Sequence, residues 1–598
     1  MIRRSSRLLL EVLAAVLAGF LVLGGLAAWR LSQDEPVRLT FLTPYIVEAL
    51  TPEDGSFKVA IDDTVLTWGG WARTIELRAT GVHVQDANGR TVAVIPALSL
   101  TLSARALILH QLVAPTAIEI IRPHIFIVRE ADGHFRFVHA APDNPSQAGE
   151  ETSPVLTRLL QTLLSAPDPS LPTGYLKRAS ITDGQLTFVD RRAGVTWHAP
   201  AANIVLGRDA LGIVGQLDLA VDRLGNPAKL NAVAVFDAKQ QKLLLTANFA
   251  GVHAGALAAI DPALGRFSGA DFTLSGRLTS SMELDGRIGG TTFDLAGGAG
   301  TLTMAGTFEA PLAVRNLALS ASFDPASDRL TLARAEIQFD GPHLQATGTI
   351  DGVHAGAGMT EDMRIGMKLT ADDVSLAELP RYWPLKVKTN PRTWIADHVS
   401  AGVARVEADI GLTLPGGEPS AAVIEQFSGT IAGSGLTVHY LDPLPPVEGA
   451  AGTGHFTRDE FDADFTTGHV QGVQIDGGTL RISGLQEPDQ IIDIEGNLHG
   501  PLSAALAILD NPRLGYAKKL GLQPEGVGGT MTATLSFSLP ARKGLTLDQM
   551  KIAATADIAD AAITNAMLGQ DLSDGNAKLK LDRVRVDGSK KRLTTTLP

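Results

Sequence analysis

The chain has 598 residues, a formal net charge of −13 and no cysteine. It exceeds the size at which a single hydrophobic core stops growing, about 250–300 residues, so one ordinary compact core cannot hold it. The absence of cysteine excludes disulfides and thiolate metal sites, and the negative charge excludes the broad basic surface that a nucleic acid requires.

The N-terminus has the features of a membrane anchor. Arg3, Arg4 and Arg7 precede an apolar run, LLLEVLAAVLAGFLVLGGLAAW, at residues 8–29. About 20 apolar residues in a helix span a hydrocarbon layer of about 30 Å, and basic residues before such a helix stay in the cytoplasm. We therefore predict a single-pass inner-membrane protein with a cytoplasmic N-terminus and a periplasmic body. The predicted anchor includes Leu8, Leu17, Phe20, Leu26 and Trp29.

A cleaved signal peptide is the alternative interpretation of this segment. Ala27 and Ala28 are small residues at which cleavage could occur. The apolar run is longer than the 7–15 residues typical of a signal peptide, which favours the uncleaved anchor.

After residue 30 the sequence alternates apolar and polar residues almost throughout. This period of two is typical of β-strands with one buried face, and 61 glycines supply turns between them. Asn88-Gly89 and Asp132-Gly133 interrupt two such runs, and pairs of this kind favour two-residue hairpin turns. Further Asp-Gly pairs begin at Asp183, Asp285, Asp340, Asp351, Asp476, Asp574 and Asp587. The pattern predicts a long antiparallel meander.

Four segments beyond the anchor have helical character. A polar linker precedes the first, Val155 to Ala166, for which Ser153 is the expected N-cap. The second is Ser375 to Trp383, and the third begins with Asn390 as its cap and ends before Gly402. The fourth, Ser503 to Leu520, is broken at Pro512.

The predicted divisions of the chain follow from these elements. They are an anchor at 1–30, an N-terminal β module at 31–140, a linker and amphipathic helix at 141–170, β segments at 171–374, 403–500 and 523–598, and helical insertions at 375–402 and 501–522.

An amphipathic sheet of this length must bury one face, and four short helices cannot cover it. Either two sheets pack together as sandwiches or barrels, or the sheet curls into a trough. An apolar trough in water is expected to hold something apolar, because large bare apolar patches are rare on soluble surfaces.

Residues that would indicate catalysis or metal binding do not form recognisable motifs. The sequence contains no nucleophile elbow, zinc-protease, P-loop or dinucleotide-binding motif. His134 and His139 are read as ordinary strand residues, and the acidic pairs at Asp62 and Asp372 as solvated turns. We expect no enzyme activity, no cofactor and no metal.

Three blocks of sequence resemble a known family. The block from Trp68 to Leu112, followed by IIRPHIFIVREADGHFRF, resembles the N-terminal module of AsmA-like proteins. YWPLKVKTNPRTWIADHVSAGVARVEADIGLTLPGG (Tyr382 to Gly417) and GLTVHYLDPLPPVEGAAGTGHF (Gly435 to Phe456) resemble the YhdP branch of that family.

The resemblance implies a mainly β fold, in which an N-terminal transmembrane helix precedes an elongated, twisted antiparallel sheet curled into a hydrophobic groove. It also implies phospholipid transport between the inner and outer membranes, with phospholipids, the inner membrane and outer-membrane or periplasmic proteins as partners. YhdP-like chains are usually longer, so we expect a truncated member. A scaffold or regulator of outer-membrane assembly, and a periplasmic glycan-active enzyme, are the alternatives.

Candidate lipid-facing residues follow from the hairpin at Asp132. With a two-residue loop, Glu130 pairs with Phe135 and Val128 with Phe137. Antiparallel pairing would then place one set of apolar residues on a single face. The candidates are Phe126, Val128, Phe135 and Phe137, together with Leu245 in the middle of the chain.

Overall fold

The computed structural model describes part of the chain. The described residues are 18–19, 22, 37–51, 57–68, 75–86, 91–130, 135–138, 168, 170–191, 195–208, 212–223, 226–237, 239–258, 265, 267–283, 287–353, 362–385, 389–417, 421–440, 443–487, 489–511, 523–541, 551–567, 570–583 and 592–596. The predicted anchor residues Leu8, Leu17, Phe20, Leu26 and Trp29 and the predicted helix at 155–166 lie outside them. Within the described residues, no helix is both long and apolar enough to cross a membrane.

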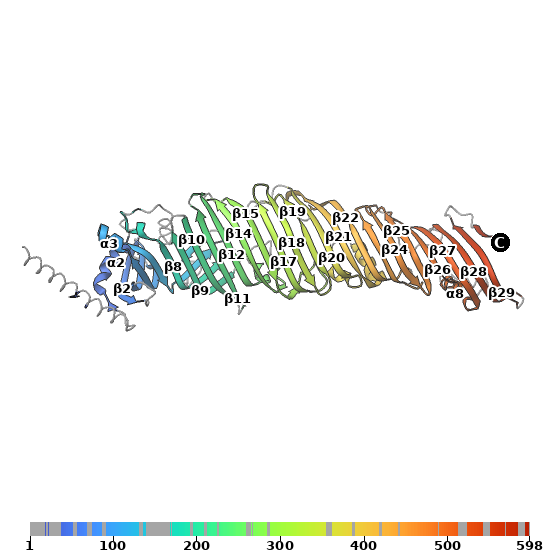
Figure 1. The fold of residues 1–598 in the computed structure, drawn as a ribbon, viewed down its shortest axis with the longest axis horizontal. Coiled ribbons are helices and arrows are strands. Elements are labelled where there is room, and N and C mark those ends of the chain that lie inside the picture. The colour runs from blue at the N-terminus through green and yellow to red at the C-terminus, as the bar shows by residue number, and fades with distance from the viewer. Residues whose placement is uncertain are drawn as a thin grey trace, which may run out of the picture. The chain divides into compact units, whose positions relative to one another are not determined.

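The described residues are mainly β, in one mixed and mostly antiparallel sheet. This agrees with the predicted fold class in its dominant element. The chain divides into two units, residues 1–268 with 273–291 and residues 269–272 with 292–598. Within each unit, most consecutive strands lie side by side (Figure 1).

The first unit contains the strands β1 (Val37–Arg38), β2 (Phe57–Trp68), β3 (Ile75–Asp86), β4 (Thr91–Leu102), β5 (Pro115–Ile121), β6 (His124–Arg129), β7 (Phe135–Val138), β8 (Arg178–Asp190), β9 (Val195–Arg208), β10 (Gly212–Arg223), β11 (Asn226–Asp237), β12 (Lys242–His253) and β14 (Thr273–Glu283). Its helices are η1 (Thr40–Leu42), α2 (Thr43–Leu50), α3 (Ala104–His110), η3 (Pro172–Tyr175) and α5 (Ala254–Leu257). β15 (Ile288–Gly297) begins in this unit and ends in the second.

The second unit contains the strands β13 (Ala270–Asp271), β16 (Gly300–Leu302), β17 (Leu312–Asp324), β18 (Arg329–Phe339), β19 (His343–Asp351), β20 (Met363–Ser375), β21 (Val399–Leu414), β22 (Val423–Val438), β23 (Val447–Phe456), β24 (Glu460–Val470), β25 (Val473–Ser483), β26 (Ile491–Pro501), β27 (Val527–Pro540), β28 (Lys551–Met567), β29 (Gln570–Arg583) and β30 (Arg592–Thr596). Its helices are α6 (Leu379–Tyr382), α7 (Thr389–His398), η5 (Pro415–Gly417), α8 (Leu502–Leu509) and η7 (Pro524–Gly526).

β8 departs from the predicted wholly antiparallel order. Its first half pairs parallel with β5 and its second half parallel with β6. A parallel return needs a connection of a dozen or more residues, and residues 139–177 between β7 and β8 supply it. Arg129 of β6 binds the buried Asp190 of β8 at 3.3 Å, and the neighbouring Arg191 binds Glu130 at 3.0 Å. These ion pairs join the ends of the two parallel strands.

The β6–β7 hairpin has a different register from the predicted one. Phe135 pairs with Arg129, and Phe137 pairs with Ile127 rather than with Val128. The prediction was wrong by one residue because five residues, 130–134, separate the paired positions instead of four. A shift of one residue moves every position of a strand to the other face of the sheet.

Three of the Asp-Gly pairs that were predicted to form hairpin turns lie inside strands. Asp183 of β8, Asp476 of β25 and Asp574 of β29 each stand at a break in strand register. Asp183 and Asp574 have positive φ angles of 52° and 58°. A β-bulge can use the same positive φ that a tight turn requires, which explains why the dipeptide did not distinguish the two.

The predicted solvated turns at Asp62 and Asp372 are likewise strand positions, in β2 and β20. Among the Asp-Gly pairs, Asp340-Gly341 does lie in a turn as predicted, between β18 and β19.

The three helical predictions that fall on described residues are correct in position, but the ends of the helices differ from those predicted. α7 begins at Thr389, so the predicted cap Asn390 lies inside the helix. Gly402 does not end that helix, because β21 begins at Val399 and Gly402 lies within it at a φ of 119°. α6 and α8 are shorter than predicted, and the predicted continuation of α8 after Pro512 lies outside the described residues. α2, α3 and α5 were not predicted.

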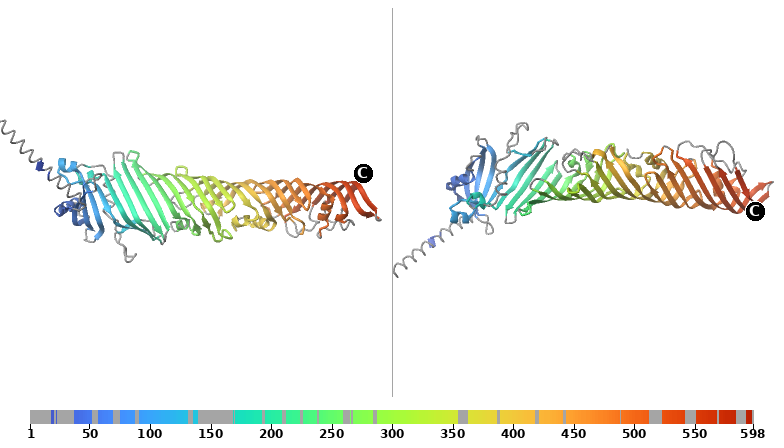
Figure 2. Two further views of the ribbon diagram at one scale, coloured as in Figure 1. Left: turned by 60° about the horizontal axis from the view of Figure 1, so that its bottom comes forward. Right: turned by 90° about the horizontal axis from the view of Figure 1, so that it is seen from above.

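The short helices cover the ends of strands on one face of the sheet. In the first unit, Ile46 of α2 packs on β2, β3 and β4 in a cluster with Leu77 and Leu98. In the second unit, the α6–α7 segment packs on Val399 and Ala404 of β21, and α8 packs on β25 and β27. Both helical segments lie along the same margin of the second unit's sheet (Figure 2, left).

Candidate functional site

The second unit carries a continuous row of apolar positions, hydrogen-bonded strand to strand. We call it the second apolar row. Its members, from β17 to β28, are Leu317, Ile337, Leu344, Ala371, Val406, Ile431, Gly454, Ala463, Leu480, Ile494, Phe537 and Ile552. Directly paired residues of neighbouring strands lie on the same face of a sheet, so these twelve positions form one apolar strip.

The opposite face of the same strands is polar. A second set of paired positions, from β18 to β28, contains only charged or hydrogen-bonding residues: Glu336, Gln345, Thr370, Glu407, Thr430, His455, Asp462, Arg481, Asp493, Ser538 and Lys551. Arg481 binds Glu460 at 2.9 Å and Asp462 at 3.4 Å across this face. The second unit therefore separates an apolar face from a water-facing one.

The first unit repeats this arrangement. We call its strip the first apolar row. Its members, from β3 to β14, are Ala79, Leu98, Ile120, Ile181, Ile204, Leu217, Ala232, Ala247 and Leu278. A parallel strip beside it runs through Leu77, Leu100, Ile118, Ala179, Leu206, Gly215, Ala234 and Leu245.

Most members of these rows are half-buried and not buried. In the first apolar row, Ala79 and Leu98 are buried in the cluster to which Ile46 of α2 belongs. The seven remaining members, from Ile120 to Leu278, are all half-buried. In the second row, Leu344, Leu480 and Phe537 are all half-buried. Apolar side chains that remain partly exposed along consecutive strands are a surface to which an extended apolar ligand can bind.

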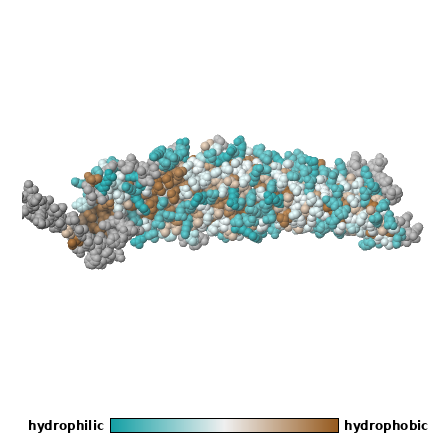
Figure 3. Space-filling model, viewed as in Figure 1, coloured by the Kyte–Doolittle hydropathy of each residue, from teal (hydrophilic) through white to brown (hydrophobic). Residues whose placement is uncertain are grey.

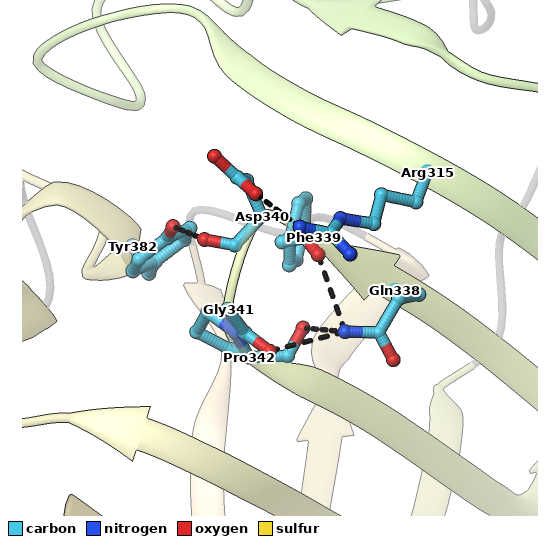
Figure 4. A network of polar contacts seen from close by, with 7 residues as sticks. All are labelled: Arg315, Gln338, Phe339, Asp340, Gly341, Pro342 and Tyr382. Carbon is cyan, nitrogen blue, oxygen red and sulfur yellow. Dashed lines mark hydrogen bonds and ion pairs between the residues drawn. The ribbon is translucent and has the colours of Figure 1, made fainter.

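Polar contacts join the end of α6 to the turn between β18 and β19 (Figure 4). The Tyr382 hydroxyl donates a hydrogen bond of 2.9 Å to the Asp340 carbonyl, and its ring lies 5.5 Å from that of Phe339. Arg315 of β17 binds the Asp340 carboxylate at 2.6 Å. The turn between β18 and β19 thus positions α6, whose Leu379 packs on the same buried cluster as Ile431 of the row.

Charge and burial shift the acidity of these groups in opposite ways. The hydrogen bond from Arg315 lowers the pKa of Asp340 below its ordinary value. Partial burial raises the pKa of the Tyr382 hydroxyl above its ordinary value, which extends the pH range over which it can donate this hydrogen bond. On the polar face, Arg329 similarly lowers the pKa of Asp351 through a 2.5 Å contact.

The candidate lipid-facing residues do not form one set. Leu245 lies half-buried on the apolar face of β12. Phe126 is half-buried and Val128 buried, and β6 alternates them with Ile125 and Ile127. The register places the strand positions of Phe135 and Phe137 opposite Arg129 and Ile127, away from Phe126 and Val128.

Ile127 belongs to an apolar strip that the sequence analysis missed. It pairs with Phe188 of β8, and Phe188 pairs with Trp197 of β9. Ile127 and Phe188 occupy alternating apolar positions in the sequence, but only the parallel register of β6 and β8 shows that they are neighbours.

Trp394 of α7 stacks on His398, with their ring centroids 5.1 Å apart, and is about half exposed. Ile395 of the same helix makes the contact with the sheet.

In the first unit, the polar face, which lies opposite the first apolar row, includes a small apolar patch. Val214, Val235 and Leu244 occupy paired positions on β10, β11 and β12, with Val233 beside them. Leu244 is 51% exposed. Figure 3 shows hydrophobic side chains gathered over these strands and polar ones around them.

Side chains able to bind a metal do not cluster within the described residues, where no group of three or more His, Asp or Glu is suitably placed. His134 and His139 lie outside the described residues.

Comparisons with known proteins agree with this geometry. A family model described as YhdP protein matches residues 263–590, more than half of the chain. No curated protein and no solved structure matches the chain. The matched segment contains the whole second apolar row and the helices that cover its margin. The chain therefore belongs to the YhdP family.

Proposed function

We propose that this protein carries phospholipids between the inner and outer membranes, with their acyl chains in a hydrophobic groove formed by the apolar face of its sheet. The observation that carries the proposal is the unbroken pairing of apolar positions across twelve consecutive strands of the second unit, beside a fully polar row on the other face.

The energetics favour a continuous apolar surface. Moving an acyl chain into water costs about 0.8 kcal/mol per CH₂. A row of similar aliphatic side chains replaces water along the path without one deep pocket that would retain the lipid. Neither row contains a charged residue, so a sliding chain meets no desolvation barrier along it.

The protein's location is part of the proposal. The arginines before residue 8 and the apolar run that follows support an inner-membrane anchor with the body in the periplasm. Fusion of alkaline phosphatase or a fluorescent protein after Arg38 tests this. We expect phosphatase activity without fluorescence, and a fluorescent fusion without phosphatase activity would refute the orientation.

The test of transport uses adjacent leucines on opposite faces of β12. Leu245→Asp places a charge among the apolar positions, whereas Leu244→Asp places the same charge on the exposed side of the same strand. An unpaired charge costs several kcal/mol in an apolar site, and about 3 kcal/mol on the barrier slows passage more than a hundredfold. We expect lipid transfer between donor and acceptor vesicles to fall at least that far for Leu245→Asp.

The Leu244→Asp variant should transfer lipid at the wild-type rate. Leu344→Asp and Thr347→Asp form a second pair on β19, since Thr347 pairs with Lys368 on the polar face. Full transfer by folded Leu245→Asp and Leu344→Asp proteins would refute the transport proposal. Loss of function in Leu244→Asp alone would instead favour a scaffold that works through the apolar part of its polar face.

A further inference from the structure

The first unit contains an apolar pocket apart from the open face of its sheet. Its volume is about 380 Å³, within the range of small-molecule sites. The surface that lines it is apolar and comes from residues of α2, from Leu77 of β3 and from the segment between Leu102 and Ala114. α2 forms one wall, and the segment that leads from β4 through α3 to β5 forms the other.

Hydrogen bonds hold both walls in place. Thr43 at the start of α2 shares a 2.9 Å hydrogen bond with the buried Thr64 of β2. Ser103 accepts a 3.1 Å hydrogen bond from the Ala106 amide at the start of α3, and its own amide donates to the Ala114 carbonyl at 2.8 Å. The pocket is therefore a formed feature of the fold.

One residue, Leu77, belongs to both the pocket lining and the apolar face. Leu77 lines the pocket and also begins the strip that continues through Leu100, Ile118 and Ala179 to Leu245. An acyl chain that entered the pocket would thus contact the first position of this strip without crossing a polar side chain.

Large apolar side chains surround the pocket and remain exposed. Phe41 is 68% exposed, Tyr45 60% and Leu109 of α3 65%. Figure 3 shows hydrophobic colour over α2 and α3. Tyrosine beside aliphatic side chains is typical of residues at a membrane interface. α3 also carries the exposed Arg105 and His110 and no carboxylate, whereas α2 carries the exposed Glu48. The side chains that complement an anionic lipid surface therefore lie on α3.

We infer that the pocket binds the end of a phospholipid acyl chain and that the surrounding residues of α2 and α3 contact an anionic lipid surface. The inference rests on the proposed transport function and specifies where in the first unit a lipid is received. The occupant is a membrane phospholipid, because the walls are apolar and the exposed side chains around them include the aromatic Phe41 and Tyr45, the aliphatic Leu109 and the basic Arg105.

The first experiment maps the occupied site. Full-length protein is reconstituted in vesicles of phosphatidylethanolamine and phosphatidylglycerol that contain a phospholipid with a diazirine near the end of one acyl chain. After illumination, mass spectrometry locates the adducts. We expect adducts on residues 103–114 as well as on β9 to β12.

A variant that fills the pocket gives the control. Val113→Trp should reduce adducts on residues 103–114 at least tenfold, and Leu244→Trp, on the polar face, should leave them unchanged. Val113→Leu adds less volume and serves if Val113→Trp does not fold. Adducts on β9 to β12 with none on 103–114 in wild-type protein would overturn the pocket inference and leave the transport proposal standing. Adducts on neither would overturn both.

The second experiment tests contact with the lipid surface. The chain has no cysteine, so Leu109→Cys and Leu244→Cys each provide one labelling site. An environment-sensitive fluorophore at position 109 should shift to the blue in the same vesicles and be quenched by brominated lipid. The fluorophore at 244 should show neither effect. Equal responses at the two positions would overturn the proposed lipid contact.

Discussion

At the scale of single residues, Asp340 links a surface ion pair to the position of a helix. Its carboxylate binds Arg315 and its carbonyl accepts the hydrogen bond from Tyr382. Exposed ion pairs contribute little to stability in general. Here the pair also fixes the turn on which α6 rests, so its loss should be visible in the local structure around the helix.

This contact gives a pH-dependent prediction. Because the pKa of Asp340 is lowered in the folded protein, the ion pair stabilises the fold above the ordinary aspartate pKa of about 3.9 and loses that effect as pH falls through the lowered value. Arg315→Gln should lower the melting temperature at neutral pH. The difference from wild type should vanish in acid.

The Asp340→Asn background supplies the control for this experiment. There Arg315→Gln should change the melting temperature little and by the same amount at every pH, because no carboxylate remains to titrate. A wild-type difference that persists unchanged down to the most acidic pH at which the protein stays folded would contradict the assignment to Asp340.

At the scale of elements, short helices decide which part of the apolar face is covered. Leu506 of α8 is buried against Val527, while Leu502 and Ile508 of the same helix pack near Met531 and Ala533. The helix has no side-chain cap and only eight residues, too few for stability in isolation. Its position therefore depends on these tertiary contacts.

Two leucines of α8 provide a matched test of this dependence. Leu506 is 8% exposed and Leu509 is 41% exposed. Leu506→Ala should cost about 2–5 kcal/mol locally, release α8 from the sheet and increase the binding of a hydrophobic dye. Leu509→Ala should change stability by less than about 0.5 kcal/mol. Hydrogen exchange of residues 502–509 measures both, and equal exchange in the two variants would contradict this role for Leu506.

At the scale of the molecule, the length of each apolar row determines how much lipid it can hold. The second row crosses twelve strands, which at about 4.8 Å per strand gives about 53 Å. The hydrocarbon of one membrane leaflet is about 15 Å thick, half of the bilayer core. On the order of three acyl chains could therefore lie end to end along this row alone.

The row length predicts a ratio of lipid to protein above one. Native mass spectrometry of detergent-extracted full-length protein should show a distribution of species with several bound phospholipids. Leu344→Asp and Leu480→Asp should lower the mean number, and the polar-face variant Thr347→Asp should not. A single tightly bound phospholipid in all of these proteins would contradict a continuous site.

The sequence by itself determined that the chain forms a two-faced β structure with a few short helices. The alternation of apolar and polar residues is a local property, since successive side chains of any strand point to opposite faces. Leu245 was chosen only as an apolar position in the middle of the chain, because the run from Leu243 to Leu245 has no alternation that would assign its face. The three helical segments that lie among the described residues were also found, because helical spacing and capping residues are local features.

Only the tertiary structure decided which positions become neighbours. The register of the hairpin after Arg129 depends on the length of its loop, and the bulges at Asp183 and Asp476 use the same dipeptide that a turn would. The parallel pairing of β8 with β5 and β6 depends on where a long connection returns to the sheet. Register and return point are set by contacts between residues far apart in the chain, and a period of two carries no information about them.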